Sequence, residues 1–415
     1  MSETQDKAPP LAGLVLAGGK QTEAEAITPF IFMVHDVSNA YLVTTNDGDV
    51  MVNTGFNASA DRNVALLKPH RTGPLKYIFL TQSHADHFGG VPEFREPGTT
   101  IVGGPEYNEA QADMLGLQAF FGPRTFKLWG STMAQGGPIK PQPNVVPDVL
   151  VDDRMTIEVG NLTFELIHAP EGETIDNILV WMPREKVVFT GNTFGPVWLS
   201  MPFLNTLRGD KPRLVRTFLK SLAKVRDLGA EILITGHGAP IIGRDKIRED
   251  LDRIEAAVTY VRDYTLEGMK AGKDVHQLVR EFKFPGNVAI GDFHGKASWA
   301  VKSIWQEYSG WFHYEDGTTA LYGVPQSSVH TDIAELAGGA GALAERGRAH
   351  VEAGRPLEAL HLAAIALNAE PANRDALLVK KAASEALLDA SGGSNLSETM
   401  WLRSEIAEID GKLAQ

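Results

Sequence analysis

The sequence predicts a layered α/β domain followed by an all-α region. Up to about residue 250, short β-rich runs alternate with helical segments, an alternation that is typical of layered α/β domains. From Asp245 onward the apolar residues keep a helical spacing of three and four: Ile247, Leu251, Ile254, Ala257, Val258 and Val261. A chain of 415 residues is also too long for one ordinary core. We therefore expect two domains, residues 1–250 and 251–415.

The composition is that of a soluble globular protein and excludes several kinds of site. A formal charge of −13 argues against a nucleic-acid surface, which needs a basic face. The chain has no cysteine, so thiolate ligands, thiol nucleophiles and disulfides are excluded, and a metal would be held by His, carboxylate or amide oxygen. The N-terminus lacks a basic region, and its apolar stretch from Leu11 to Ala17 is short. We expect no signal peptide, no membrane span and a cytoplasmic location.

Five short strands are expected in the first half of the α/β domain. Residues 1–27 are rich in small and polar side chains and should run over the surface. The expected strands cover residues 30–34, 40–44, 50–52, 77–80 and 101–103, and the expected helices cover 58–67 and 107–116. Asp47-Gly48 predicts a hairpin, and Asn57 is expected to cap the first helix. The stretch 121–147, which contains Gly136-Gly137-Pro138, shows little periodicity and is expected to be a lid over a pocket or a plain surface loop.

The second half repeats this alternation, with polar residues at its strand ends. Strands are expected over residues 155–159, 162–168, 177–181, 186–190 and 231–235, with a helix over 212–228. His168, Glu171 and Glu173 follow the second of these strands, and Asn192 follows the fourth. His237 follows the last strand, within Gly-His-Gly. These loops are therefore where ligands and catalytic groups are expected.

A metal site is predicted in the loop after the fourth expected strand. Its sequence, Thr81-Gln82-Ser83-His84-Ala85-Asp86-His87-Phe88-Gly89-Gly90, places three strong ligand side chains, His84, Asp86 and His87, within four residues. A loop leaving a buried strand can direct all three inward, towards a cation such as zinc. The two glycines are expected to let the backbone turn sharply. Given this cluster, His237 is expected to be a further ligand rather than a core histidine.

This loop resembles the signature of the metallo-β-lactamase fold, which reads His-x-His-x-Asp-His after a short strand and often continues with Gly-Gly. Gln82 stands where that pattern has its first His. Asn53-Thr54-Gly55 stands where relatives usually carry Asp-x-Gly, and Thr190-Gly191-Asn192 stands where a Thr-Gly-Asp turn supplies a bridging carboxylate. The resemblance implies an αββα sandwich, with His237 as a ligand of the second metal.

Over nearly its whole length the chain is similar to the alkylsulfatase branch of that superfamily, hydrolases that remove sulfate from alkyl sulfate esters. Residues 169–173, Ala-Pro-Glu-Gly-Glu, stand where that family has Thr-Pro-Gly-Thr-Glu, whose Glu binds metal. The resemblance therefore implies Glu173 as a ligand, with His168 and Glu171 as alternatives. Thr206-Leu207-Arg208-Gly209 matches a segment whose Arg contacts the sulfate.

The all-α region resembles the alkylsulfatase dimerisation domain and so implies a homodimer. The likeness covers residues 294–299, 310–312 and 335–340 and continues through a tetratricopeptide-like helix pair around Gly354-Arg355-Pro356. Within it, His294 falls where the relatives have Tyr, and Trp299 falls where they have His. Four aromatic residues should line the substrate pocket or, as we prefer, belong to the interdomain core: Trp299, Trp305, Trp311 and Phe312. The chain ends where many relatives continue into a third, sterol-carrier-like domain, so preference for a long detergent-like tail is a weaker expectation.

The resemblance distributes the ligands over two metal positions. One would hold His84, Glu173 and Gln82; the other would hold Asp86, His87 and His237, with Asn192 as the nearest match to the bridging acid. We expect one or two zinc ions per chain, with weaker attraction for the second because Gln82 and Asn192 are neutral. Zinc with three protein ligands and one open position lowers the pKa of bound water towards about 7 and produces hydroxide at neutral pH.

Three functions stay open from the sequence. In the first, a metal-dependent hydrolase cleaves a sulfate ester. Asp86 and Arg208 would be its catalytic residues, and Arg208 and His294 would bind the anionic small-molecule substrate. The planar guanidinium of Arg208 suits sulfate, although the same residue could form a surface salt bridge. In the second, the substrate is another ester, a lactone, a β-lactam or a thioester. The third is a dimeric scaffold in which the loss of ligands at Gln82 and Asn192 has removed catalysis.

Overall fold

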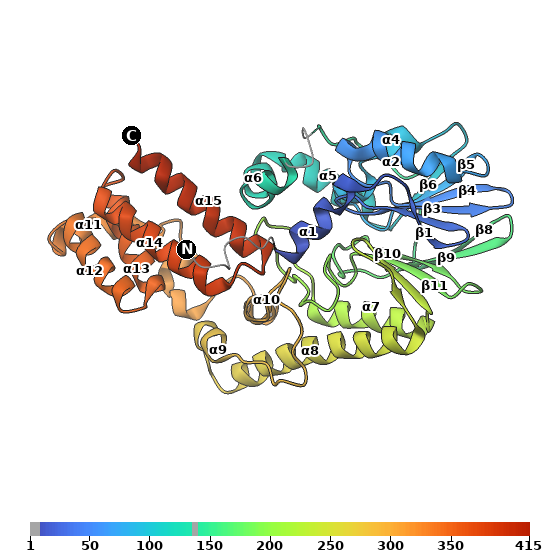
Figure 1. Cartoon of the computed structure of the whole chain (residues 1–415). Helices are drawn as coiled ribbons and strands as arrows, with labels where there is room; N and C mark the ends of the chain where they lie inside the picture. Colours follow the sequence, from blue (N-terminus) through green and yellow to red (C-terminus); the bar gives the residue numbers. More distant parts are fainter. Residues whose placement is uncertain (1–8, 135–139) are drawn as a thin grey trace. The chain divides into compact units, whose positions relative to one another are not determined.

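The structure is a computed structural model that describes residues 9–134 and 140–415. It divides into two compact units, one from Pro10 to Trp305 and one formed by Gln306–Gln415 together with Pro9. The first unit contains both β-sheets, and the second is helical (Figure 1). This arrangement of an α/β domain followed by an all-α domain is the one that the sequence predicts.

The first sheet has seven strands in the order of the chain. They are β1 (Glu25–Thr28), β2 (Ile31–Val34), β3 (Ala40–Thr45), β4 (Gly48–Val52), β5 (Leu75–Phe79), β6 (Thr100–Gly103) and β7 (Val149–Leu150). β1 to β4 pair antiparallel, and β4 to β7 pair parallel. The predicted hairpin joins β3 to β4, where Thr45 pairs with Gly48 and the glycine has a φ of 100°.

The second sheet has six strands in the order β13-β12-β11-β10-β9-β8. Their bounds are β8 (Arg154–Val159), β9 (Leu162–His168), β10 (Ile178–Met182), β11 (Val187–Gly191), β12 (Ile232–Thr235) and β13 (Ile241–Ile242). β11 and β12 pair parallel, so their carboxyl ends meet at one edge of the sheet. The loops after these two strands carry Asn192 and His237.

The two sheets pack face to face through a shared apolar core. Phe79 from the first sheet meets Phe164 from the second with ring centroids 5.4 Å apart, and Tyr41 meets Phe189 at the same distance. Outside the sheets lie α2 (Ala60–Leu67), α3 (Ala85–Phe88), α4 (Val91–Phe94), α5 (Tyr107–Gly116), α7 (Val215–Leu228) and α8 (Arg244–Lys270). Figure 1 shows α2 and α4 over the first sheet and α7 and α8 beneath the second. The predicted αββα sandwich is therefore confirmed.

The helices that follow β13 continue the core of this sandwich. α8 buries Ile247, Leu251 and Ile254 in the same apolar cluster as Phe218 and Leu222 of α7. The cluster extends to α9 (Val275–Glu281) and to α10 (Ala297–Ser309). Residues 247–261 are thus helical, as their periodicity predicts. The compact units divide after Trp305 and not near residue 250, because one face of α8 packs on α7.

The helical unit packs through small side chains. Its helices are α11 (His330–Leu336), α12 (Ala340–Glu352), α13 (Pro356–Ala369), α14 (Arg374–Ser391) and α15 (Leu396–Leu413), preceded by short 3-10 turns at Tyr314–Asp316, Thr318–Leu321 and Gln326–Val329. Ala344, Ala359, Ala363 and Ala366 are fully buried, which lets α12 and α13 approach closely, as the tetratricopeptide-like pattern predicts.

Several local expectations are wrong. Part of the N-terminal stretch is helical, in α1 (Pro10–Leu16) and a 3-10 turn (Ala17–Lys20), because Leu11 and Val15 are apolar and buried. The stretch 121–147 is not all irregular, since α6 (Gln118–Ala134) covers its first part; Gly136 to Pro138 lie outside the described residues.

Two predictions about single residues also fail. Asn57 begins a 3-10 turn (Asn57–Ser59), and its Nδ2 donates to the carbonyls of Lys140 and Pro141, so it is no side-chain cap for α2. Gly89 and Gly90 have negative φ angles of −58° and −86°. They are needed for space instead, because a Cβ on Gly89 would lie 2.6 Å from the backbone nitrogen of Asn57. A further 3-10 turn, Lys68–His70, ends α2.

Candidate metal centre

Three of the predicted ligands converge where the two sheets meet. Asp86 and His87 lie on α3, which follows β5 of the first sheet, and His237 follows β12 of the second. Oδ2 of Asp86 is 3.6 Å from Nε2 of His87 and 3.8 Å from Nε2 of His237, and one ligand atom from each residue lies within 4.8 Å of the others. Among the described residues this is the one group of three or more acidic, His or Cys side chains with metal-binding geometry.

Both histidines of this group are held in the neutral form. Burial lowers the pKa of His87 to about 3, with a further lowering from His84 that the charge of Glu173 only partly offsets. Burial likewise lowers the pKa of His237 to about 4, against an opposing effect of Asp86. Metal ligation needs neutral imidazole, so at neutral pH these two rings meet that requirement.

His84, the other predicted histidine ligand, is engaged at both ring nitrogens. Its Nδ1 is 3.0 Å from Nε2 of Gln82, whose own Oε1 accepts from the backbone N–H of Asn192 at 3.1 Å. Its Nε2 is 3.3 Å from Oδ2 of Asp210 and 3.0 Å from Nη2 of Arg208. The structure thus places Gln82, His84 and Arg208 together, but in a hydrogen-bonded network.

Glu173 belongs with Gln82, His84 and Arg208 to a second group of side chains, and it is paired with a buried arginine. Its Oε1 lies 3.7 Å from Nη2 of Arg213, 3.8 Å from Nε2 of His294 and 4.0 Å from Nδ1 of His84. Burial by itself raises the pKa of Glu173, but Arg213 and His294 outweigh it and hold that pKa well below its usual range. Glu173 is therefore a buried carboxylate with its countercharge already in place.

Arg213 and Asp210 are site residues that the sequence reasoning missed. The side chain of Arg213 is 2% exposed and donates to the backbone carbonyls of Glu173 and Phe203. Oδ2 of Asp210 lies 3.7 Å from Nη2 of Arg213. Burial alone would raise the pKa of Asp210, but its contact with His84 and the charges of the two arginines hold it well below the usual range. The sequence marks these two residues only by their position, directly after the Thr-Leu-Arg-Gly segment.

Amide side chains face the other two histidines. Nδ2 of Asn53 is 2.9 Å from Nδ1 of His87, and Nδ2 of Asn192 is 3.2 Å from Nε2 of His237. Gly236 makes room for this arrangement, because a Cβ there would lie 2.1 Å from Oδ1 of Asn192. Ser38, which the sequence did not single out, has its Oγ 3.2 Å from the His87 ring and donates to the carbonyl of Gly236.

The two alternatives to Glu173 have other partners. Nε2 of His168 lies 3.0 Å from the carbonyl oxygen of Ile175, and Oε2 of Glu171 accepts from the backbone N–H of Leu214 at 3.0 Å. Nε2 of His168 also lies 3.6 Å from Oε2 of Glu106, whereas Oε1 of Glu173 lies 4.0 Å from Nδ1 of His84. Glu173 is therefore the carboxylate of this loop that reaches the predicted ligands.

The predicted aromatic group does not stay together. Trp305 belongs to the core formed with α7 and α8, while Trp311 is 74% exposed. Trp299 is half-buried and lies against Phe203, with centroids 5.4 Å apart, and Phe203 in turn meets the edge of His294. Of the four, only Trp299 is placed near a site residue by these ring contacts.

The two groups differ in how well they fit an ion. Asp86, His87 and His237 offer one carboxylate and two neutral imidazoles at spacings that suit a shared cation such as zinc, so this donor set fits one ion. Around His84, the ring nitrogen nearest to Glu173 already faces Gln82, and Arg213 pairs with Glu173. These contacts make the position around His84 less suited to an ion than the group of Asp86, His87 and His237.

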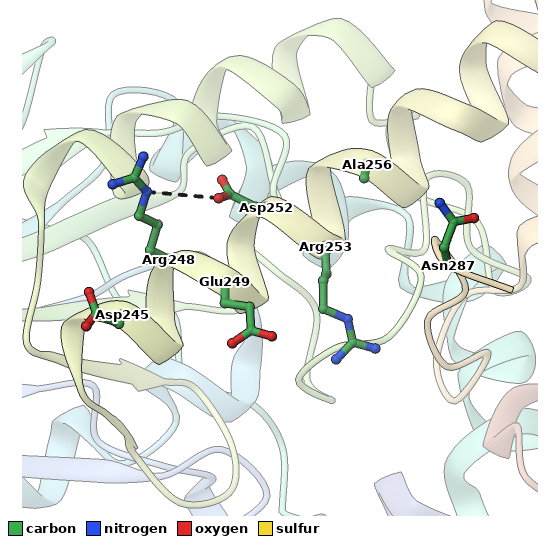
Figure 2. A pocket seen from close by; sticks show the side chains of 7 residues that line it. All are labelled: Asp245, Arg248, Glu249, Asp252, Arg253, Ala256 and Asn287. Carbon is green, nitrogen blue, oxygen red and sulfur yellow. Dashed lines mark ion pairs between the residues drawn. The ribbon is translucent and has the colours of Figure 1, made fainter. Parts of the chain in front are cut away.

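A hollow on α8 is unrelated to either group. Figure 2 shows its lining by Asp245, Arg248, Glu249, Asp252, Arg253, Ala256 and Asn287. Nε of Arg248 lies 4.0 Å from Oδ2 of Asp252, a weak ion pair on the polar face of a helix. None of these residues belongs to the groups described above, so the hollow is no part of the centre.

Two family models match the chain. Residues 34–237 match the metallo-beta-lactamase superfamily, a range that contains Asn53, the loop of His84 to His87, Glu173, Arg208 and His237. Residues 275–403 match alkyl sulfatase dimerisation. No helix among the described residues is both long enough and apolar enough to cross a bilayer.

Several of the curated relatives that the chain matches are alkylsulfatases, and others are lactamase-like proteins. A linear primary-alkylsulfatase of a Pseudomonas strain is 27% identical over 297 residues, which is 65% of this chain and 56% of the relative. An (R)-specific secondary-alkylsulfatase of Pseudomonas is 25% identical over 405 residues, 87% of this chain and 59% of the relative. The chain thus spans somewhat over half the length of these proteins.

A solved structure shares the fold over nearly the whole chain. The stereoselective inverting sec-alkylsulfatase Pisa1 from Pseudomonas superimposes with a TM-score of 0.83 at 22% identity, covering 98% of this chain and 69% of that one. At this identity the likeness concerns the fold. Taken with the two family models, it identifies a metallo-beta-lactamase domain followed by an alkyl sulfatase dimerisation domain in this chain.

Proposed function

We propose that this protein is a metal-dependent hydrolase of sulfate esters of the alkyl sulfate type. The observation that carries the proposal is the convergence of Asp86, His87 and His237 in one group, in a chain that also carries the alkyl sulfatase dimerisation region. A bound zinc would act there as a Lewis acid and would lower the pKa of a coordinated water. The remaining steps depend on the side chains around it.

Arg208 is proposed to hold the sulfate group. Its Nη2 is 3.3 Å from Asp210 and 3.0 Å from His84, and its Nε is buried without a hydrogen-bond partner among the described residues. An arginine with a free donor beside the metal ligands suits an anion, because the planar guanidinium can form two parallel hydrogen bonds to sulfate oxygens.

His294 is proposed to contact the same anionic group from the opposite side. Its Nε2 lies 3.8 Å from Oε1 of Glu173, and its ring packs at right angles to Phe203, with centroids 5.1 Å apart at an angle of 89°. Neutral or protonated, an imidazole can donate a hydrogen bond to a sulfate oxygen. Phe203 and Trp299 then form an apolar wall beside it, which limits access of water.

An apolar surface next to Arg208 supports an alkyl chain as the other half of the ester. A Cβ on Gly209 would lie 3.3 Å from Phe121 and 3.5 Å from Phe120, both on α6. Phe120 is 50% exposed and Leu207 is 42% exposed. Apolar side chains beside an anion-binding arginine match a substrate that joins a charged sulfate to a hydrocarbon.

The test is sulfate release from alkyl sulfates by wild type, Arg208→Ala and Arg208→Lys, with a carboxylic ester as the comparison substrate. Loss of a hydrogen-bonded charge costs about 3 kcal/mol, so Arg208→Ala should lower kcat/KM on sulfate esters roughly 100-fold. Arg95→Ala, which removes an exposed ion pair with Asp148, is the matched control. Hydrolysis of only the carboxylic ester, a lactone or a thioester by wild type would reject the sulfatase proposal in favour of another esterase.

A scaffold without catalysis is the second candidate. The observation in its favour is that Gln82, Asn53 and Asn192 face His84, His87 and His237 with amide nitrogens. Zinc binding together with chelator-sensitive turnover of any ester would reject it. A protein that takes up no zinc and turns over no ester would support it.

A homodimer is proposed for the assembly. The support is the match of residues 275–403 to alkyl sulfatase dimerisation and a run of exposed aromatic and aliphatic residues in the same region: Trp311, Tyr314, Tyr322 and Leu336. Sedimentation velocity at micromolar concentration should give a dimer, and a single monomer boundary would contradict the proposal. Residence in the cytoplasm stays a prediction from the sequence.

A further inference from the structure

Gln82 is held in one orientation beside His84. Its Oε1 accepts the backbone N–H of Asn192 at 3.1 Å, which leaves Nε2 as the end that faces Nδ1 of His84 at 3.0 Å. The side chain is fully buried, and a Cβ on Gly191 would lie 3.4 Å from the same Oε1. Because an amide nitrogen can only donate, the lone pair of Nδ1 is taken up by a hydrogen bond.

The other nitrogen of His84 is committed as well. Nε2 lies 3.3 Å from Oδ2 of Asp210 and 3.0 Å from Nη2 of Arg208. His84 therefore bridges Gln82 to Asp210 within a hydrogen-bonded chain. Nε2 of His87 faces the carboxylate of Asp86, whereas Nε2 of His84 has a guanidinium beside it, so an ion at His84 would meet a positive charge.

The charges around His84 already cancel. Glu173 is a buried carboxylate and Asp210 a half-buried one, and both lie 3.7 Å from Nη2 of Arg213. Arg208 lies 3.3 Å from Asp210. Two carboxylates thus face two guanidiniums, and Arg213 is anchored by two backbone carbonyls, so it cannot swing away to admit a dication. In a buried position, a fixed guanidinium repels a further cation strongly.

A bridging carboxylate is also missing between the two groups. At its position Asn192 presents Nδ2 to Nε2 of His237 at 3.2 Å, and its Oδ1 is buried without a hydrogen-bond partner in the described part of the chain. A neutral amide adds no negative charge to share between two ions. The Gln82 amide, the Arg213 guanidinium and the Asn192 amide therefore all disfavour binding of an ion at the second position.

We propose that the chain holds a single divalent ion, at Asp86, His87 and His237, and that the Gln82–His84 hydrogen bond and the Arg213 guanidinium take the place of the second ion. The presence of the first ion rests on the proposed function. The replacement of the second is independent of which ester is cleaved. If the second ion is replaced in this way, the positive charge at the second position is a permanent part of the protein and is not removed by chelators.

The test is the zinc stoichiometry of the full-length chain. Protein is stripped with a chelator, desalted and titrated with zinc by calorimetry, and the bound metal is then counted by elemental analysis. Wild type should bind one zinc, His87→Ala should bind none, and His84→Ala should still bind one. Gln82→His combined with Asn192→Asp and Arg213→Gln should bind a second zinc, whereas Gln118→His, which adds an imidazole at an exposed position of α6, should not.

The outcomes separate this inference from the proposed function. Two zincs on wild type, one of them lost in His84→Ala, would overturn the single-ion inference and leave the hydrolase proposal standing. One zinc that depends on His84 and not on His87 would overturn it as well. No zinc on wild type would overturn both. The wild-type count decides the question even where a variant fails to fold, and circular dichroism identifies such variants.

Discussion

Asn53 donates its side-chain amide to Nδ1 of His87 at 2.9 Å, while its own oxygen accepts the backbone N–H of Thr81 at 2.9 Å. The second hydrogen bond fixes which end of the amide faces the ring. The first places the proton of the neutral ring on Nε2, the nitrogen that points at Asp86. A metal ligand needs the opposite tautomer, with Nδ1 donating to an acceptor.

We therefore predict that Asn53→Asp strengthens metal binding. A carboxylate at this position would accept from Nδ1 of His87 and free the Nε2 lone pair, and such outer partners change metal affinity by about 10–100-fold. Zinc Kd values measured by competition with a chromophoric chelator should fall by that factor. Asn161→Asp, which adds the same charge in the exposed β8–β9 hairpin, should leave the Kd unchanged. An equal or weaker affinity of Asn53→Asp would contradict the tautomer argument.

The stability of the metal-free protein should fall as the pH is lowered from about 7 to 4. His87 and His237 have pKa values of about 3 and 4 in the folded state, below the 6.5 of a free histidine. Between these values the unfolded chain binds protons that the folded chain does not, so the free energy of unfolding rises with pH, by up to about 2.7 kcal/mol per pH unit for two groups. The stabilisation is present above pH 6.5 and lost as the pH falls towards 4.

Urea unfolding of chelator-treated protein at pH 7.5, 6 and 5 measures this slope. The double variant His87→Gln/His237→Gln should have a flatter profile, because neither replacement titrates in this range. His276→Gln, on the exposed side of α9, should keep the wild-type slope. A wild-type stability that stays constant or rises between pH 7.5 and 5 would show that the two rings are not kept neutral by burial.

Gly236→Ala should destabilise the centre. The new Cβ would lie 2.1 Å from Oδ1 of Asn192 and 2.9 Å from Cε1 of His87, so both side chains would have to move. Overpacking of this kind costs about 1–3 kcal/mol, and the displacement of His87 should also weaken zinc binding. Gly116→Ala is the control, because nothing lies within 4 Å of its added Cβ. If both variants match wild type in thermal unfolding and zinc affinity, the crowding around Gly236 is not rigid.

Arg213→Ala should cost far more stability than an ordinary arginine substitution. It would leave the buried Glu173 and the half-buried Asp210 without their shared countercharge, and breaking a buried pair from one side costs about 3–5 kcal/mol. Arg95→Ala removes a partly exposed ion pair and should cost at most about 1 kcal/mol. Arg213→Ala/Glu173→Gln should recover part of the loss. Chemical denaturation of the three variants measures these differences, and equal losses for both single variants would argue against a buried network.

The sequence predicts most of the fold because its signals are local and periodic. The alternation of β-rich and helical runs places ten of the thirteen strands of the described chain and misses β1, β7 and β13, while the Asp47-Gly48 turn places a hairpin correctly. The misses have physical reasons. α6 contains Pro123 and glycines that disfavour a helix in isolation, and α1 is too short for a periodic signal. α8 is amphipathic, but periodicity does not reveal which core its apolar face will join.

At the centre, the sequence identifies residue types and the structure identifies partners. The cluster of His84, Asp86 and His87 is visible because three strong ligands within one loop are rare. Arg213 and Asp210 carry no such signal. The importance of Arg213 depends on burial and on its contact with Glu173, and that of Asp210 depends on a contact with His84, more than a hundred residues away. The orientation of the Gln82 amide likewise depends on the backbone of Asn192, far away in the chain.

The ligands of the proposed ion come from opposite sheets, and other bonds join the sheets at the same place. Tyr41 of β3 donates to the carbonyl of Thr235 at 2.6 Å, and the backbone N–H of Asn39 donates to that of Gly236 at 2.8 Å. An ion bound by Asp86, His87 and His237 would therefore cross-link the two sheets. Separation of the two sheets would release the ion, so the amount of zinc retained would measure how firmly the sheets stay packed as well as the chemistry of the ligands.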